Sequence, residues 1–296
     1  MRFGILTLNW EPFSYNVKFY EEIATYAEKF EYDSFFVTDH YLRPFLEVEP
    51  NTIKRHATID AWSLLAYIAA KTEFIRIGSC VTPLPMRNPA ILAKIVSTID
   101  NLSNGRVIFG VGAGYERREF EAYAHWEASS IRVLKVKEAI ILMKKLWTED
   151  MVDFEGKFFK VKRAALEPKP VQKPHPPIWV GAMHEKMFHI TVELVDGWIP
   201  ARSLGATPEF YAENSKRILL LAEKIGRKIM LGLMGYITDE GFSTPLPSLA
   251  TIKDVEKVLE QYKNLGCEYF IAVFFPIEKY ITLMKKFRQE IIPSFS

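Results

Sequence analysis

The chain has 296 residues, of which 49% are hydrophobic and 25% are charged, an ordinary balance for a soluble globular protein. Its formal net charge is only +2, without a basic stripe, which argues against binding to nucleic acid. Because no run of about 18 apolar residues is present, we expect no membrane-spanning helix. The N-terminus begins a strand rather than a signal peptide, and Cys80 and Cys267 lie in apolar segments. We therefore expect a cytoplasmic protein with reduced, buried thiols.

Short apolar runs alternate with amphipathic helical patterns along nearly the whole chain. Strands are expected at residues 3–8, 34–38, 75–81, 107–111, 178–181, 197–199, 229–237 and 269–275. Helices are expected at residues 18–30, 59–71, 89–102, 132–147, 185–194, 208–225, 252–265 and 278–291. Eight strands, each followed by a helix, predict an α/β fold of the (β/α)8 TIM-barrel type, with residues 1–296 as a single domain.

Several connections in this pattern are long. Residues 41–58, 113–130 and 238–250 each follow an expected strand, so these insertions surround the C-terminal face of the barrel. A fourth, residues 148–177, contains DFEGKFFKV, which is typical of a small hairpin, and then a proline-rich run. Loops of this length in a compact domain are usually functional or mobile.

The segment from Arg76 to Tyr115 carries the clearest sign of a binding site. Two apolar strands flank a helix, and they run into VTP at 81–83 and GVGAG at 110–114. Glycine permits close approach of a ligand, and α/β proteins bind ligands at the carboxyl ends of parallel strands. GxGxG lacks the later glycine of a dinucleotide fingerprint. We interpret it as a surface for a planar ring or, alternatively, as tight packing under the following loop.

Asp39 and His40 form a polar pair at the end of the second expected strand. An imidazole at that place is suited to exchanging a proton near neutral pH. The alternative interpretation is a turn cap for Asp39 and a surface loop position for His40. The remaining histidines lack the spacing of metal ligands, so no metal site is expected.

Two other segments carry weaker signals. Gly181-Ala182-Met183 ends the fifth expected strand directly before a helix, where free backbone amides suit a phosphate. The charged residues 116–119 follow the fourth strand, and a solvated loop face is their default interpretation, with one member able to reach the cleft.

Together these segments resemble the bacterial-luciferase-like superfamily of flavin and deazaflavin (F420) oxidoreductases. The resemblance is carried by TDH at 38–40, RIGSCVTPLPMRNPAILAK, SNGRVIFGVGAGYERREF, LWTEDMVDFEGKFFKV, EPKPVQKPHPPIWVGA, VDGWIP and LGCEYFIAVFF. It spans nearly the whole chain and implies the same luciferase-like TIM barrel, with the flavin-like ring at the carboxyl ends of the strands.

The resemblance also implies roles for single residues. A non-prolyl cis peptide is expected at Ser79-Cys80, or one residue later, behind the ring. His40 is the implied proton donor or substrate-orienting group. Asp39 is implied to hydrogen-bond the pyrimidine end of the ring, and residues 181–183 to cradle the cofactor phosphate. The implied cofactor-binding residues are Asp39, Ser79, Cys80, Val81, Thr82, Gly112, Ala113, Gly114, Gly181, Ala182 and Met183.

The chain differs from the F420-dependent dehydrogenases of this superfamily at three places. Arg43-Pro44-Phe45 stands where they carry a tryptophan, and Tyr115, with Glu116 next to it, stands where they carry a glutamate. Tyr115 and Glu116 therefore join His40 as candidate catalytic residues. The expected phosphate loop reads Gly-Ala-Met-His-Glu rather than Gly-Gly-Ser-Gly-Pro. These differences argue against oxidation of a sugar phosphate.

The resemblance leaves three functions open. The first is an oxidoreductase that uses coenzyme F420, or FMN, to transfer a hydride to or from a small organic substrate. The second is an FMN-dependent two-component monooxygenase, supplied with reduced cofactor by a flavin or F420 reductase. The third is a flavin-binding barrel without turnover. Relatives form dimers, so a homodimer is expected.

Overall fold

The computed structural model describes residues 1–10, 13, 16–243 and 248–295. Contacts between Cα atoms divide the chain into two units. Unit 1 consists of residues 1–6, 22–36 and 179–296, and unit 2 consists of residues 7–21 and 37–178. Within the described residues, no helix has the length and hydropathy needed to span a membrane.

Unit 1 holds a set of neighbouring strands, in the order β2-β1-β12-β10-β9-β8, with β11 also beside β10. The pairs of β1 with β12, β12 with β10, β10 with β9 and β9 with β8 are parallel. The strands are β1 (Arg2–Thr7), β2 (Ser34–Val37), β8 (Ile178–Val180), β9 (Gly197–Trp198), β10 (Met230–Thr238), β11 (Ala250–Thr251) and β12 (Tyr269–Phe275).

The helices of unit 1 follow the predicted alternation. They are α1 (Val17–Lys29), which begins in unit 2, α6 (Glu185–Leu194), α7 (Pro208–Lys224), α8 (Val255–Asn264) and α9 (Tyr280–Glu290). Thr207 accepts a hydrogen bond from the Phe210 amide and caps α7, with Pro208 in the first turn. Gly226 and Gly266, directly after α7 and α8, have positive φ, as expected of residues that end helices.

Aromatic side chains fill the interior of unit 1. Trp198 stacks on Tyr211 at 5.2 Å between ring centroids, and Tyr211 meets Tyr262 edge-on at the same distance. All three side chains are fully buried. Burial of a large apolar side chain stabilises a fold by about 1.5–3 kcal/mol, so this cluster fixes α7 and α8 against β9.

Unit 2 contains the parallel pairs of β3 with β5 and of β4 with β5, and an antiparallel hairpin of β6 and β7. Its strands are β3 (Arg76–Ser79), β4 (Thr82–Pro83), β5 (Val107–Gly112), β6 (Val152–Glu155) and β7 (Lys160–Ala164). Its helices are α2 (Ala61–Lys71), α3 (Pro89–Leu102), α4 (Arg117–Tyr123) and α5 (Ser129–Thr148). The predicted hairpin in residues 148–177 is confirmed.

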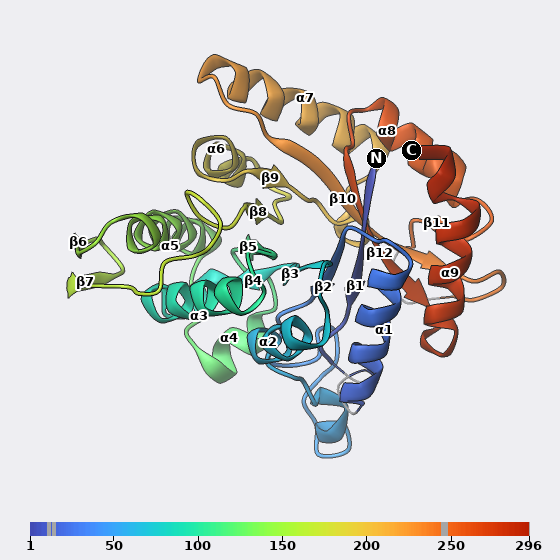
Figure 1. Ribbon diagram of the computed structural model, residues 1–296, viewed down its shortest axis with the longest axis horizontal. Helices are drawn as coiled ribbons and strands as arrows, with labels where there is room; N and C mark the ends of the chain where they lie inside the picture. The colour runs from blue at the N-terminus through green and yellow to red at the C-terminus, as the bar shows by residue number, and fades with distance from the viewer. Residues whose placement is uncertain (11–12, 14–15, 244–247, 296) are drawn as a thin grey trace. The chain divides into compact units, whose positions relative to one another are not determined.

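The core of unit 2 lies between its strands and the helices α2, α3 and α5. Phe109 of β5 packs against Trp62 at 5.6 Å and Trp147 at 5.8 Å between ring centroids. The Trp147 indole also donates to the Ala93 carbonyl, at 2.9 Å, which ties α5 to α3. These two helices run side by side in Figure 1, with the β6–β7 hairpin next to α5.

The structure corrects the sequence prediction in two places and leaves a third partly undescribed. The strand expected at 75–81 is interrupted, since β3 ends at Ser79 and β4 begins at Thr82. Helix α4 was not expected, because its sequence is mostly charged. The loop expected at 238–250 is described only in part, and residues 244–247 lie outside the described residues.

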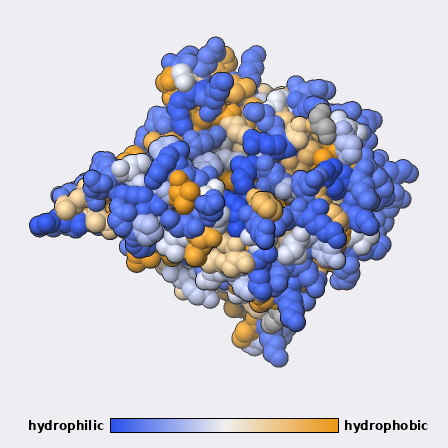
Figure 2. Space-filling view, viewed as in Figure 1, coloured by the Kyte–Doolittle hydropathy of each residue, from blue (hydrophilic) through white to orange (hydrophobic). Residues whose placement is uncertain are grey.

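Hydrophilic residues predominate on the face shown in Figure 2, and hydrophobic residues are scattered among them. Single exposed apolar side chains are normal for a globular protein. The exposed aromatic residues that matter for the site, Phe45 and Tyr115, have relative exposures of 60% and 45%.

Candidate functional site

The centre of the candidate site is a hydrogen-bonded pair of His40 and Glu119 in unit 2. Nδ1 of His40 lies 2.9 Å from Oε2 of Glu119. Oε1 of the same carboxylate accepts the backbone amides of Tyr41, at 2.7 Å, and Leu42, at 2.9 Å. The two side chains are only 14% and 3% exposed. A carboxylate that accepts two amides has its remaining oxygen available for an N–H donor, so in the neutral imidazole Nδ1 carries the proton and Nε2 is the unprotonated nitrogen.

Two residues that follow β1 hold His40 from the other side. Asn9 donates to the His40 carbonyl at 2.8 Å and accepts the His40 amide at 3.2 Å. It also donates to the Ile59 carbonyl at 2.8 Å. Trp10 meets the imidazole ring edge-on, at 5.1 Å between centroids. The imidazole is therefore fixed through its backbone, its ring face and Nδ1, which excludes a mobile surface position for His40.

Asp39, next to His40, is paired with Arg87. The guanidinium donates to both carboxylate oxygens, from Nε at 3.0 Å and from Nη2 at 2.6 Å. It also bonds Asp60, at 2.7 Å, and lies over the Tyr41 ring at 5.2 Å. Burial raises the pKa of Asp39, while Arg87 opposes that shift. Because arginine keeps its proton throughout the ordinary pH range, the two residues form an ion pair.

Thr82 supports this pair rather than presenting a free hydroxyl. Its Oγ1 accepts the Trp62 indole N–H at 3.0 Å, and its side chain hydrogen-bonds Asp39. Thr82 is completely buried. The Thr82 hydroxyl thus serves to position the Asp39 carboxylate, and its predicted place near the cofactor ring stays a prediction.

The ends of β3 and β5 form a surface of small residues. The peptide bond between Cys80 and Val81 is cis, the later of the two predicted positions. Gly112 is buried at the end of β5, whereas Val81, Ala113 and Gly114 are half-buried. Burial raises the pKa of the Cys80 thiol to about 12, so this thiol stays protonated and contributes apolar surface only.

Close packing explains the glycines in β5 and just after it. A Cβ on Gly110 would lie 1.9 Å from the Ser79 carbonyl oxygen, and one on Gly114 would lie 2.6 Å from the Phe120 ring. The Ser79 hydroxyl is buried and donates to the Gly110 carbonyl at 2.8 Å. The packing interpretation therefore holds for Gly110 and Gly114, while the half-buried backbone after Gly112 is still accessible.

Tyr115 lies beside Nε2 of His40. Its hydroxyl is 3.4 Å from Nε2, and the two ring centroids are 5.6 Å apart. On its other side, Tyr115 stacks on Phe45, with centroids 5.9 Å apart and an interplanar angle of 24°. Predicted site residues from two separate segments, 38–40 and 112–115, are thus brought together.

Glu116 anchors the loop that carries Phe45. Its Oε2 accepts the Phe45 amide at 3.2 Å, and its carboxylate pairs with Arg118 at 2.8 Å. Burial opposes the ionisation of Glu116, but Arg118 and the backbone amides outweigh it and hold its pKa below the usual range. Glu116 therefore organises the loop that carries Phe45.

The prediction of a solvated face for residues 116–119 is wrong for two of its members. Glu116 and Glu119 are buried, 9% and 2% exposed, because α4 turns both toward the segment 40–47. Arg117 does face solvent and pairs with Glu121. The i, i+3 spacing of the two glutamates, followed by Phe120, was the available sign of a helix with an inward face.

Sequence reasoning also missed Asn9 and Arg87. Asn9 belongs to no recognisable sequence motif. Its role follows from its hydrogen bonds to the backbone carbonyls of His40 and Ile59. Arg87 directly precedes Asn88, which caps α3. The sequence around Arg87 gave no indication that its side chain pairs with Asp39.

In unit 1, the turn Gly181-Ala182-Met183 lies between β8 and α6. Ala182 is buried, and its carbonyl accepts the Trp198 indole N–H at 2.8 Å. His184 occupies the N-cap position of α6 without a side-chain hydrogen bond to the helix. The role of this turn in holding a phosphate stays a prediction.

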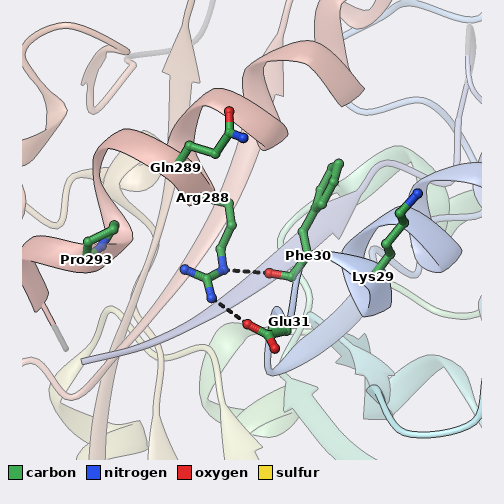
Figure 3. Close-up of a pocket in the computed structure, with 6 residues that line it drawn as sticks. All are labelled: Lys29, Phe30, Glu31, Arg288, Gln289 and Pro293. Carbon is green, nitrogen blue, oxygen red and sulfur yellow. Dashed lines mark hydrogen bonds and ion pairs between the residues drawn. The ribbon is translucent and has the colours of Figure 1, made fainter.

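A separate pocket of unit 1, shown in Figure 3, does not belong to the predicted site. It lies where α1 ends, before the amino end of β2, whereas ligands bind at the carboxyl ends of barrel strands. Arg288 crosses it and donates to the Phe30 carbonyl at 2.7 Å and to Glu31 at 2.6 Å. Its lining residues are Lys29, Phe30, Glu31, Arg288, Gln289 and Pro293.

Parallel strands that alternate with helices are the arrangement of a (β/α)8 barrel, and barrels of this kind bind their ligands at the carboxyl ends of the strands. The chain belongs to the luciferase-like monooxygenase family, whose model matches residues 1–240. An F420-dependent glucose-6-phosphate dehydrogenase of Microbacterium testaceum is 31% identical over 194 residues, which cover 65% of this chain and 54% of that protein. The chain thus spans little more than half the length of the curated relatives it matches.

Solved structures of low sequence identity share the fold over the whole chain. An F420-dependent secondary alcohol dehydrogenase in complex with an F420–acetone adduct is 20% identical, with a TM-score of 0.82 over 100% of this chain and 99% of that one. A monooxygenase from Streptomyces bottropensis is 18% identical, with a TM-score of 0.83 and full coverage of both chains. These likenesses confirm the predicted luciferase-like (β/α)8 barrel.

Proposed function

We propose that this protein is an oxidoreductase that binds coenzyme F420, or FMN, beside residues 39–40, 79–82 and 112–115. In this proposal a hydride passes between the cofactor and a small organic substrate, and His40 exchanges the accompanying proton through Nε2. The observation that carries the proposal is the fixed orientation of His40, held at Nδ1 by Glu119 with Nε2 left toward Tyr115. Matching relatives named as F420-dependent dehydrogenases support the choice of cofactor.

The described residues fit a planar, partly polar ring. Val81, Ala113 and Gly114 offer a half-buried, small, apolar surface, and Nε2 of His40 adds a polar group beside it. When bound, the flavin-like cofactor supplies the hydride chemistry at C5 of F420 or N5 of FMN. The protein's own part is to orient the ring, exclude water and handle the proton.

His40 and Glu119 handle that proton as a unit. For oxidation of an alcohol, Nε2 accepts the hydroxyl proton, and the resulting imidazolium is stabilised by the Glu119 carboxylate 2.9 Å from Nδ1. For reduction of a carbonyl, the same nitrogen returns a proton to the oxygen. Asn9 and Trp10 keep the ring in place during both steps.

The test is a titration of the purified protein with F420 and, separately, with FMN, followed by changes in fluorescence. We expect tight binding of F420 and retention of that binding in His40→Gln. Turnover of the variant is expected to fall by about 10²–10⁴-fold, the usual contribution of a positioned general acid–base group. Absence of binding to either cofactor would refute the proposal.

FMN-dependent oxygenation is the second candidate, favoured by the family itself and by the monooxygenase of the same fold. Tight binding of FMN with no binding of F420 would select it. A small-molecule substrate fits both candidates, whereas the homodimer and the reductase that would supply reduced cofactor stay predictions.

A further inference from the structure

Phe45 and Tyr115 form an exposed aromatic wall next to the reactive nitrogen of His40. The rings are stacked, and both are exposed, with relative exposures of 60% and 45%. Tyr115 in turn contacts His40. A wall of this kind offers apolar surface within reach of the group that exchanges the proton.

The backbone holds the wall in a costly conformation. Phe45 has a φ of 60°, in the left-handed region that bulky residues avoid. The Glu116 carboxylate accepts its amide at 3.2 Å, and Arg118 donates to the Leu46 carbonyl next to it. Such conformations are strained and persist where the surroundings enforce them, often at ligand-binding sites. The contacts from α4 supply that enforcement here.

The contact between Tyr115 and His40 leaves room for a substrate oxygen. At 3.4 Å, the Tyr115 hydroxyl lies beyond the usual range for a strong hydrogen bond to Nε2. A substrate hydroxyl can therefore donate to this nitrogen at little cost, and a carbonyl oxygen can accept from it when Nε2 carries a proton. The wall and Nε2 together are suited to a molecule with one polar group and an apolar remainder.

Charge in the network around His40 disfavours an anionic substrate. Arg87 is held by two carboxylates, and Arg118 is held by two others. Arg43, in the same segment, also has a partner. Because carboxylates already pair with both guanidinium groups, Arg87 and Arg118 attract a phosphate dianion only weakly, whereas a neutral molecule needs no such charge.

We propose that the site takes an uncharged alcohol or ketone with an apolar, preferably aromatic, substituent that packs on Phe45 and Tyr115. This inference rests on the proposed function. In the oxidation, the C–H bond of the carbinol carbon breaks and its electron pair leaves as hydride to the oxidised cofactor, the hydroxyl proton passes to Nε2 of His40, and the C=O bond forms. The alcohol is oxidised by two electrons and the cofactor is reduced by two.

The experiment compares two probes on the cofactor-loaded protein, 4-phenyl-2-butanone and glucose 6-phosphate, with binding measured by calorimetry. We expect the neutral ketone to bind at least tenfold more tightly than the sugar phosphate. Phe45→Ala should weaken ketone binding about tenfold and leave cofactor binding intact. Phe74→Ala is the matched control, since Phe74 is 79% exposed in the connection before β3, and it should change neither.

Three results would overturn the inference once cofactor binding is established. They are equal or tighter binding of glucose 6-phosphate, no binding of the ketone, and equal effects of Phe45→Ala and Phe74→Ala. Loss of sugar-phosphate binding in Arg43→Gln would identify a phosphate site and count against the inference as well. Failure of the preceding cofactor titration counts instead against the proposed function, so the two failures are distinguishable.

Discussion

Two polar clusters lie at opposite ends of β3 and β5 in unit 2, and they differ in how completely their hydrogen bonds are satisfied. At the amino ends, Arg106 is 9% exposed and directs its guanidinium at backbone carbonyls and one hydroxyl. Its acceptors, at 2.7–2.9 Å, are the carbonyls of Ser103, Ile75, Ala69 and Thr72 and the Thr72 hydroxyl. This saturated cluster has no basic site to offer, because an arginine does not release its proton.

At the carboxyl ends, the cluster of His40, Glu119, Asp39 and Arg87 consists of acid–base groups. Among the described residues, Nε2 of His40 has a single hydrogen-bond contact, at 3.4 Å to the exposed Tyr115. Burial of charged groups therefore does not by itself identify a functional site. What marks it is a titratable atom held in place by its neighbours while still open on one side.

The first variant removes Nε2 of His40, the nitrogen that is proposed to exchange the proton. His40→Gln should lower kcat/KM by about 10²–10⁴-fold, because the proton then has no acceptor. Cofactor affinity and Tm should stay within error, since other contacts hold the segment. The matched control is His125→Gln, an exposed histidine of the loop after β5, with full activity expected. Equal activity of the two variants would remove His40 from the chemistry.

The second variant removes Arg106, the donor of the saturated cluster at the amino ends of β3 and β5. Arg106→Met should lower the free energy of unfolding by about 3 kcal/mol or more, because several buried carbonyls lose a donor at about 1–3 kcal/mol each. Tm should fall by roughly 6 °C or more in a thermal melt. Arg117→Met, at a side chain that is 66% exposed, should shift Tm little.

Kinetics make that test specific. At a temperature where Arg106→Met is still folded, its kcat/KM should equal that of the wild type. A loss of activity without a loss of stability would show that the cluster around Arg106 is functional. The two clusters would then not differ in role.

Local sequence signals predicted much of the fold. Helix α3 begins and ends as expected, because Asn88 caps it and Pro89 occupies its first turn. The glycines and prolines that follow the strands also pointed to the segments that form the candidate site, since they are features of single segments. Short stretches of the chain are therefore enough to predict the fold class and the location of the strand ends.

The partners within the site could not be predicted in the same way. His40 and Glu119 are 79 positions apart, and Asp39 and Arg87 are 48 apart. Pairing over such distances depends on how strands and loops are placed, which periodicity does not encode. Charged residues in a loop are solvated by default, so only the inward turn of α4 shows that Glu119 is buried.

The third prediction sharpens the role of Glu119 as a positioning residue. Glu119→Gln keeps an oxygen for the amides of Tyr41 and Leu42 but places an NH₂ group opposite Nδ1. The neutral imidazole should then carry its proton on Nε2, which removes the basic site. We expect a loss of roughly 10–100-fold in kcat/KM, the scale seen when a partner that orients a histidine is removed.

A spectroscopic readout separates positioning from simple structural damage. Nitrogen-15 NMR of His40 should show the protonated nitrogen moving from Nδ1 to Nε2 in Glu119→Gln. The exposed control Glu121→Gln should leave the tautomer and the rate unchanged. An unaltered tautomer in Glu119→Gln would contradict the assignment.

The smallest effect concerns the anchor of the aromatic wall. The pKa of Glu116 is lowered in the folded protein from an ordinary value of 4.5. A carboxyl of this kind contributes stability that is fully present above pH 4.5 and is lost as the pH falls through its folded pKa. Wild type should therefore exceed Glu116→Gln by about 1 kcal/mol at pH 7, and the gap should close in acid below pH 4.5. A gap that does not change with pH would show that the Glu116 charge does not hold Phe45, and the wall would then depend on packing alone.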